Sequence, residues 1–93
     1  YIPHGITKGA IVQMTRSLAR VMAPEVRVNG IAPGTVLLPD DWSERDARRL
    51  DETTPLRRQG SPGDVVQAML YLLEADYVTG ETIIVDGGRH VRT

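Results

Sequence analysis

The 93-residue chain is 41% hydrophobic and 25% charged and carries a formal net charge of −1, which is typical of a soluble globular segment and not of a disordered, collagenous or membrane protein. The near-zero charge gives no reason to expect a nucleic acid partner, and no apolar run approaches the ~20 residues that a membrane-spanning helix needs. The absence of cysteine excludes disulfides, Cys-based zinc sites and thiol catalysis, and it fits a reducing compartment. We therefore expect a cytoplasmic protein without a membrane partner.

The chain begins at Tyr1, not at Met, and its first residues already lead into a predicted helix. Natural domains seldom begin so abruptly. We therefore expect an N-terminal part that is cleaved, lost or supplied by another chain. The alternative is a complete small protein whose initiator Met has been removed. The length allows at most one small domain, with an unfavourable ratio of surface to volume.

A long amphipathic helix is predicted over 5–22, because apolar residues recur there at spacings of three and four. This apolar stripe comprises Ile6, Ala10, Ile11, Met14, Leu18, Val21 and Met22. Pro24 ends the helix. At its start, His4 and Lys8 are one helical turn apart and project from the same face. A titratable group over an ammonium makes this helix start a candidate site framework.

The β-branched run 26–32 predicts a short strand that Pro33 and Gly34 close. The apolar segment 35–39 is flanked by chain breakers and is predicted to be a loop. The charged segment 40–60 contains a short predicted helix over 43–52, with Ser43 as a candidate N-cap. Trp42 and Leu50 are either its buried contacts or part of a lid. For such a polar segment, a movable flap and plain surface decoration both remain open.

Ser61, Pro62 and an acid in the first turn predict a further helix start. The helix is expected to bury five apolar side chains, Val65, Val66, Met69, Leu72 and Leu73. The apolar run 81–86 predicts a second strand, which Gly87 and Gly88 end. We expect the two glycines to allow close backbone approach, Asn29 to bond neighbouring backbone, and His90 to lie in a tail as a solvated or subunit-contact residue.

Two strands with helices between them indicate a parallel crossover and an α/β fold. Two parallel strands do not make a stable sheet alone, so the pattern favours the edge of a larger sheet. In open α/β sheets, ligands bind beyond the carboxyl ends of the strands. After the first strand this position is taken by Pro33, Gly34, Thr35 and Val36.

Four stretches carry a resemblance to a known family: TKGA at 7–10, LA at 18–19, APEVRVNGIAPG at 23–34 and YVTGETIIVDGG at 77–88. They cover nearly the whole chain, and their order and spacing resemble the C-terminal part of a short-chain dehydrogenase/reductase. Two shorter runs, VLLPDD at 36–41 and TPL at 54–56, also resemble the pteridine-reductase branch. The resemblance implies that 1–93 is the C-terminal portion of one doubly wound, Rossmann-type parallel-sheet domain.

The resemblance also implies an oxidoreductase that transfers hydride between NAD or NADP and a carbonyl, alcohol or pterin-like substrate. The absent N-terminal half, as partner, would supply the glycine-rich cofactor loop and the catalytic serine. In this chain, Lys8 would bind the nicotinamide ribose, and Pro33, Gly34, Thr35 and Val36 would present backbone groups to the carboxamide. The substrate loop would include Leu37, Leu38 and Trp42. Family members commonly pair through the active-site helix and the last helix and strand, which implies a homo-dimer or tetramer.

One departure from the family pattern concerns the proton. The family helix carries Tyr-x-x-x-Lys, whereas this chain has His4-x-x-x-Lys8. A histidine starts near a pKa of ~6.5, and a nearby Lys⁺ depresses that pKa, so His4 accepts a proton at neutral pH but donates one poorly. Three interpretations remain open: a weakened or retuned enzyme with His4 and Lys8 as catalytic residues, a catalytically silent cofactor-binding or assembly relative, and proton transfer by a group outside this chain.

Overall fold

The computed structural model describes residues 2–34 and 41–91, with the backbone alone for 2–5. The elements are α1 (Ile2–Met22), β1 (Gly30–Pro33), α2 (Glu44–Thr53), α3 (Pro62–Glu74), β2 (Thr82–Val85) and a short 3₁₀ turn, Arg89–Val91. The three predicted helices are confirmed, with α1 beginning earlier than its apolar stripe. The residues after Gly88, predicted to be a tail, instead fold back in the 3₁₀ turn.

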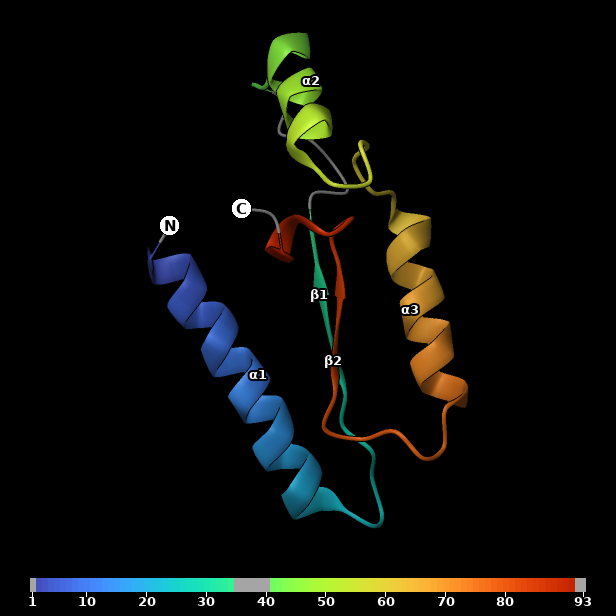
Figure 1. Ribbon diagram of the computed structural model, residues 1–93. Helices are drawn as coiled ribbons and strands as arrows, with labels where there is room; N and C mark the ends of the chain where they lie inside the picture. The colour runs from blue at the N-terminus through green and yellow to red at the C-terminus, as the bar shows by residue number, and fades with distance from the viewer. Residues whose placement is uncertain (1, 35–40, 92–93) are drawn as a thin grey trace.

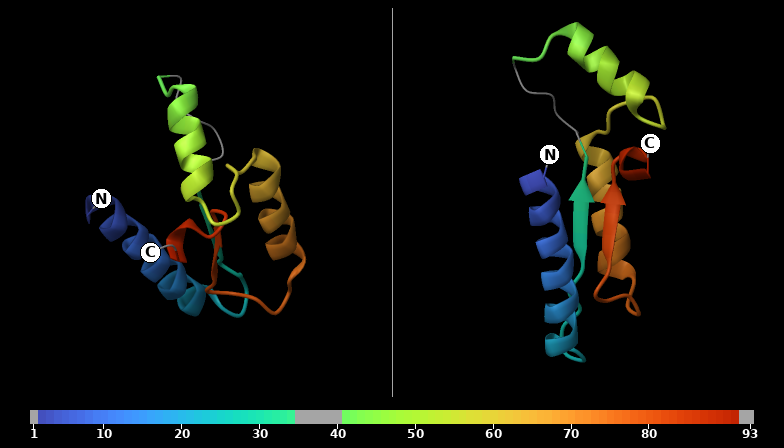
Figure 2. Two further views of the ribbon diagram at one scale, coloured as in Figure 1. Left: turned by 45° about the horizontal axis from the view of Figure 1, so that its top comes forward. Right: turned by 60° about the vertical axis from the view of Figure 1, so that its left-hand side comes forward.

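The two strands form a parallel pair in which Gly30 lies opposite Thr82 and Pro33 opposite Val85. Figure 1 shows both strands running in the same direction between α1 on one side and α3 on the other, and the two views of Figure 2 agree. α1 packs on β1, and α3 packs on both strands. The predicted α/β arrangement with a parallel crossover is therefore confirmed.

The first strand begins at Gly30 and not at Val26, so the predicted strand over 26–32 is wrong in its first half. The backbone of Val28 is bonded instead to the segment before β2: its N–H donates to the Thr79 hydroxyl at 3.0 Å, and its carbonyl accepts from Gly80 at 2.8 Å. The Asn29 side chain donates to the Val78 carbonyl at 2.9 Å and accepts the Glu81 N–H at 3.1 Å. The structural role predicted for Asn29 is thus confirmed.

The packed face of α1 is not the predicted apolar stripe. Among residues 6–22 of this helix, Thr15 and Ala19 are buried, with 7% and 4% of their surface exposed. Their small side chains allow close packing, since a Cβ on Gly30 would lie 3.3 Å from the Thr15 hydroxyl. All stripe residues are exposed, from Met22 at 40% to Val21 at 77%. Because a two-stranded sheet is narrow, it covers only one thin face of the helix.

The narrow sheet also leaves much of α3 uncovered. Of its five predicted core residues, Leu72 is buried and Val65 is half-buried, whereas Val66, Met69 and Leu73 are exposed. Leu50 of α2 is also buried, which confirms one of the two contacts predicted beside that helix. The face of α3 that packs on the sheet is only partly covered, because β1 and β2 form a narrow surface.

The ends of the helices are fixed by local hydrogen bonds. Ser43 caps α2: its hydroxyl accepts the Asp46 N–H at 3.2 Å, while the Asp46 carboxylate accepts the Ser43 N–H at 3.0 Å. This confirms the predicted N-cap. The C-terminal end of α3 is capped by a side chain from elsewhere in the chain: the Arg27 guanidinium donates to carbonyls of the last turn of α3.

Among the described helices, none combines the length and the apolar character that a membrane span requires.

Candidate active site

The beginning of α1 and the carboxyl ends of β1 and β2 lie at the same edge of the molecule, and α2 extends beyond that edge (Figures 1 and 2). This is the edge where open α/β sheets bind ligands. Lys8 lies on α1 near this edge and is half-buried. His4 lies one turn earlier in α1, and its side chain is outside the described part of the structure. The predicted helical spacing of these two positions is therefore present.

Pro33 and Gly34 end β1 at this edge, as the sequence predicted. Gly34 donates its N–H to the Val85 carbonyl at 2.7 Å, which extends the strand pairing by one bond. A Cβ on Gly34 would lie 2.8 Å from the Asp86 Cβ and 2.9 Å from its Cα. Only glycine lets the two strand ends approach this closely. The other predicted cofactor and substrate-loop positions, Thr35, Val36, Leu37 and Leu38, lie outside the described residues.

Trp42, the remaining substrate-loop residue, stands just before α2 and is 40% exposed. It lines a surface hollow of about 500 Å³ together with side chains of α2 and Arg89. Its exposure means that it is not a core contact of α2. A lid role for Trp42 stays a prediction.

A hydrogen-bonded polar cluster at this edge, formed by Asp86, Gly88 and His90, was not predicted from the sequence. The Asp86 carboxylate accepts the Gly88 N–H at 2.9 Å and the His90 N–H at 3.0 Å, and it lies 3.0 Å from His90 Nδ1. Burial acts to raise the pKa of Asp86, but the hydrogen bonds from His90 and Gly88 outweigh it and hold that pKa below its usual value. The signal was present in Gly87 and Gly88, whose φ angles of +65° and +92° turn the chain back after β2.

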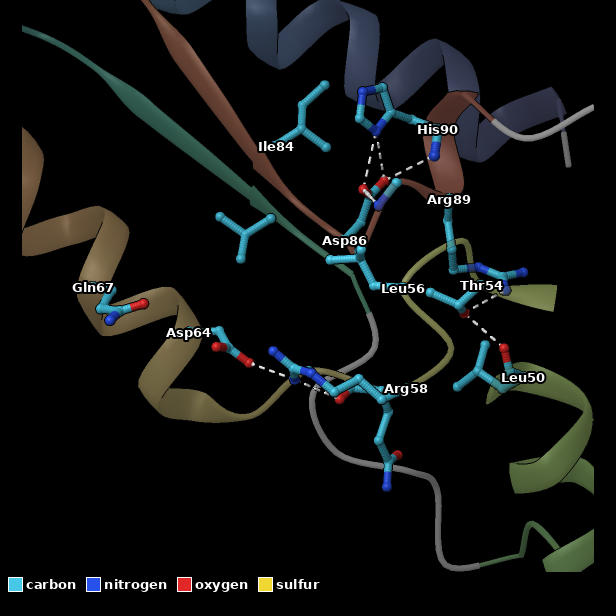
Figure 3. A pocket seen from close by; sticks show the side chains of 15 residues that line it. Leu50, Thr54, Leu56, Arg58, Asp64, Gln67, Ile84, Asp86, Arg89 and His90 are labelled. Atoms are coloured by element: carbon cyan, nitrogen blue, oxygen red, sulfur yellow. Dashed lines mark hydrogen bonds and ion pairs between the residues drawn. The ribbon is translucent and has the colours of Figure 1, made fainter. Parts of the chain in front are cut away.

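A cavity of about 350 Å³ lies beside this turn, between the end of β2 and residues of α2, α3 and the loop that joins them (Figure 3). Its polar wall includes Arg58 and Asp64, whose side chains form an ion pair at 3.2 Å. The Ser61 backbone N–H, followed by the Arg58 guanidinium, lowers the pKa of Asp64. Lys8 does not line this cavity. The cavity and the predicted catalytic helix are therefore separate features of the same edge.

Among the described side chains, those of residues 6–34 and 41–91, no three His, Asp or Glu residues converge in a way that could hold a metal ion. Lys8 forms no ion pair with any carboxylate of the described residues. An ammonium without such a partner can donate hydrogen bonds to hydroxyl groups of a ligand. The helix start and the strand ends together form a frame for binding a small molecule.

The sequence of the chain is similar to those of known proteins. Residues 1–90 match the family model described as "Enoyl-(Acyl carrier protein) reductase". A granaticin polyketide synthase putative ketoacyl reductase from Streptomyces violaceoruber is 42% identical over 97% of this chain and 38% of its own length. A dihydromonapterin reductase from Citrobacter koseri is 40% identical over 99% of this chain and 38% of its own length.

Solved structures agree. A short-chain dehydrogenase/reductase of the glucose/ribitol dehydrogenase type from Brucella melitensis is 42% identical and superimposes with a TM-score of 0.81, covering 91% of this chain and 36% of that one. A short-chain dehydrogenase from Leptospira borgpetersenii with bound NAD+ is 36% identical, with a TM-score of 0.81 over 94% of this chain and 35% of its own. A small-chain dehydrogenase in complex with NADPH is 32% identical, with a TM-score of 0.78 over 87% of this chain and 39% of its own.

The chain spans under two-fifths of the length of these relatives. The identities exceed 30% over nearly all of its residues, and the structural neighbours confirm the Rossmann-type parallel-sheet fold that the family resemblance implied. The arrangement of α1, the two strands and α3, together with the family match over residues 1–90, shows that the chain belongs to the short-chain dehydrogenase/reductase family.

Proposed function

We propose that the protein is an NAD(P)-dependent oxidoreductase in which this chain supplies the active-site helix and the substrate side. The observation that carries the proposal is the position of Lys8, half-buried in α1 at the edge where β1 ends in Pro33 and Gly34. The oxidoreductase names of its relatives, and neighbours solved with NAD+ and with NADPH, support it. When bound, the nicotinamide would donate the hydride to a carbonyl or accept it from an alcohol.

In this proposal Lys8 binds the ribose hydroxyls of the cofactor through its ammonium, which no described carboxylate neutralises. The backbone of Pro33, Gly34, Thr35 and Val36 holds the carboxamide and so orients the ring. Leu37, Leu38 and Trp42 contribute to the substrate side. His4 handles the proton: one turn before Lys8, it accepts a proton from an alcohol more readily than it donates one to a carbonyl.

The second candidate is a catalytically silent cofactor-binding or assembly protein. The observation that favours it is His4, which stands where the family resemblance expects tyrosine. An imidazole is a weaker donor to a developing alkoxide at neutral pH than a tyrosine tuned by lysine and cofactor, and it reaches less far. The fold and the Lys8 position are compatible with both candidates.

A homo-dimer or tetramer belongs to the same proposal. The apolar stripe of α1 is exposed in the chain, as are Met69, Leu70 and Leu73 of α3. Exposed apolar surface of this extent on two helices marks faces that another element or subunit covers. The N-terminal half of the same protein and a second copy are the partners proposed for them.

The test uses the purified full-length protein. NADPH and NADH are titrated by fluorescence, and turnover is then measured with a ketoacyl thioester, dihydromonapterin and ribitol, following the names of the relatives. Lys8→Met should weaken cofactor binding and lower turnover by roughly tenfold each, because a charged hydrogen bond is lost. Arg16→Met, an exposed change on the same helix, serves as the control.

The outcomes separate the candidates. Hydride transfer that depends on Lys8 supports the enzyme. Cofactor binding without hydride transfer to any of the substrates favours the silent relative. A protein that binds neither NADPH nor NADH contradicts the enzyme and the cofactor-binding relative, and it leaves only an assembly role.

A further inference from the structure

Helix α2 is attached to the rest of the structure at its C-terminal end. Residues 44–46 are exposed, whereas Leu50 and Thr54 are buried, with 8% and 2% of their surface exposed. Figures 1 and 2 show the helix extending beyond the carboxyl ends of both strands, with its last turn nearest to the turn that follows β2. The placement of α2 over the ligand edge therefore depends on what holds this last turn.

Arg89 makes the polar contacts at this point. Its Nη1 donates to the Thr53 hydroxyl at 3.0 Å and to the Thr54 hydroxyl at 3.1 Å. The Thr54 hydroxyl in turn donates to the Leu50 carbonyl at 2.6 Å, so the guanidinium is linked to the final turn of α2 (Figure 3). Because the Thr54 side chain is buried, water cannot easily replace the arginine as its donor.

The backbone around Arg89 is shaped to receive the end of α2. The Leu56 N–H donates to the Gly87 carbonyl at 3.1 Å. A Cβ on Gly87 would lie 2.8 Å from the Thr54 Cγ2, and one on Gly88 would lie 3.1 Å from Pro55. Both glycines also have positive φ angles, which an L side chain rarely adopts. The turn after β2 thus forms a close-fitting seat for residues 54–56.

Arg89 also lines the hollow that Trp42 and Arg49 share along α2. Arg89 therefore touches both the seat and the hollow beside α2. We propose that Arg89 is a positioning residue, which fixes α2 through Thr53 and Thr54 and thereby shapes the substrate side of the site. This inference rests on the proposed oxidoreductase function, because it assigns α2 to the substrate and not to the cofactor.

The first arm of the test measures amide hydrogen exchange in the full-length protein without any ligand. Arg89→Met keeps an unbranched side chain but removes the donors. Exchange over residues 48–56 should become roughly fivefold faster, the effect of losing about one net hydrogen bond, while α3 stays unchanged. Arg48→Met removes the same charge from α2 without touching the seat and should leave the exchange unchanged. Arg89→Lys should give an intermediate rate, because the ammonium still donates.

The second arm measures kinetics with whichever substrate of the panel is turned over. Arg89→Met should raise the KM for that substrate about fivefold, while the Kd for NADPH or NADH changes less than about twofold. Arg89→Lys should recover part of the loss. A merely structural role would instead affect substrate and cofactor together.

Two results overturn the inference: unchanged exchange over 48–56, or equal acceleration in α3, which would mean general destabilisation. Faster exchange in α2 with an unchanged substrate KM overturns its functional half. Absence of turnover in the unaltered protein would instead contradict the proposed function, and the exchange arm would still decide whether Arg89 holds α2.

Discussion

Arg27 caps the C-terminal end of α3, and its hydrogen bonds allow the effect of its removal on the free energy of unfolding to be predicted. The Arg27 guanidinium donates to the Leu72 carbonyl at 2.7 Å, to the Ala75 carbonyl at 3.0 Å and to the Leu73 carbonyl at 3.2 Å. These carbonyls belong to the last turn and the C-cap of α3, which has no basic residue of its own there. A positive charge at this end also complements the helix dipole.

Arg27→Met should therefore lower the free energy of unfolding by about 2 kcal/mol. Three bonds at ~1.5 kcal/mol each would set an upper value near 4.5 kcal/mol. The actual loss is smaller because Arg27 is largely exposed, so water can bind the freed carbonyls. Arg27→Lys, with one flexible ammonium in place of the fork, should lose about half as much.

The assay is urea unfolding of the full-length protein, with the slope of the transition compared between variants. Arg20→Met is the control: it removes the same charge from the last turn of α1, where the side chain is exposed. Surface changes of this kind usually stay within ~0.5 kcal/mol. If Arg27→Met destabilises no more than Arg20→Met, the three carbonyl contacts contribute nothing and the capping argument fails.

Three further predictions follow from the ligand edge. Gly34→Ala should destabilise by about 1–3 kcal/mol in thermal unfolding, because its Cβ overlaps Asp86; a neutral result would mean that the strand ends can separate freely, and Gly63→Ala, with only a 3.6 Å neighbour, is the control. The lowered pKa of Asp86 means that its charged form stabilises the fold above its usual pKa of ~3.9 and that this stability is lost as the pH falls through the lowered value. Asp86→Asn should thus flatten the acid side of the unfolding free energy, and an unchanged pH profile would exclude Asp86 as its source. His4→Tyr should raise carbonyl reduction at neutral pH by roughly 10²-fold, measured as kcat/KM; the same rate with cofactor still bound would show that position 4 carries no proton.

Local signals in the sequence predicted the helices well. Ser43 and Ser61 mark the starts of α2 and α3, and both are N-caps in the structure. The β-branched run before Pro33 misled the strand boundary, because Val28 finds its hydrogen-bond partners in Thr79 and Gly80 and not in β2. Such partners about fifty residues away leave no trace in a local pattern.

The sequence predicted only those parts of the candidate site that depend on local pattern. Periodicity and breakers place Lys8 and Gly34, and the topology rule brings them to one edge. The contacts of Arg89 with Thr53 and Thr54, and of His90 with Asp86, depend on how the chain turns after β2. The apolar stripe of α1 was expected to pack inward, but the residues against the sheet are Thr15 and Ala19. Small residues that permit close approach carry no hydrophobic signal, so the pattern favoured the wrong face.

The pairing of β1 with β2 has a consequence for how the protein is made. Asn29 and Glu81 are 52 positions apart, and Arg27 reaches α3 across 45 positions. During synthesis β1 therefore emerges long before β2, and until β2 emerges the backbone groups on that edge of β1 have no partner strand. Joining such distant segments costs loop-closure entropy before any contact forms, which slows folding. Truncation just before β2 should leave the edge of β1 exposed to pairing with other chains, so β2 protects that edge against aggregation.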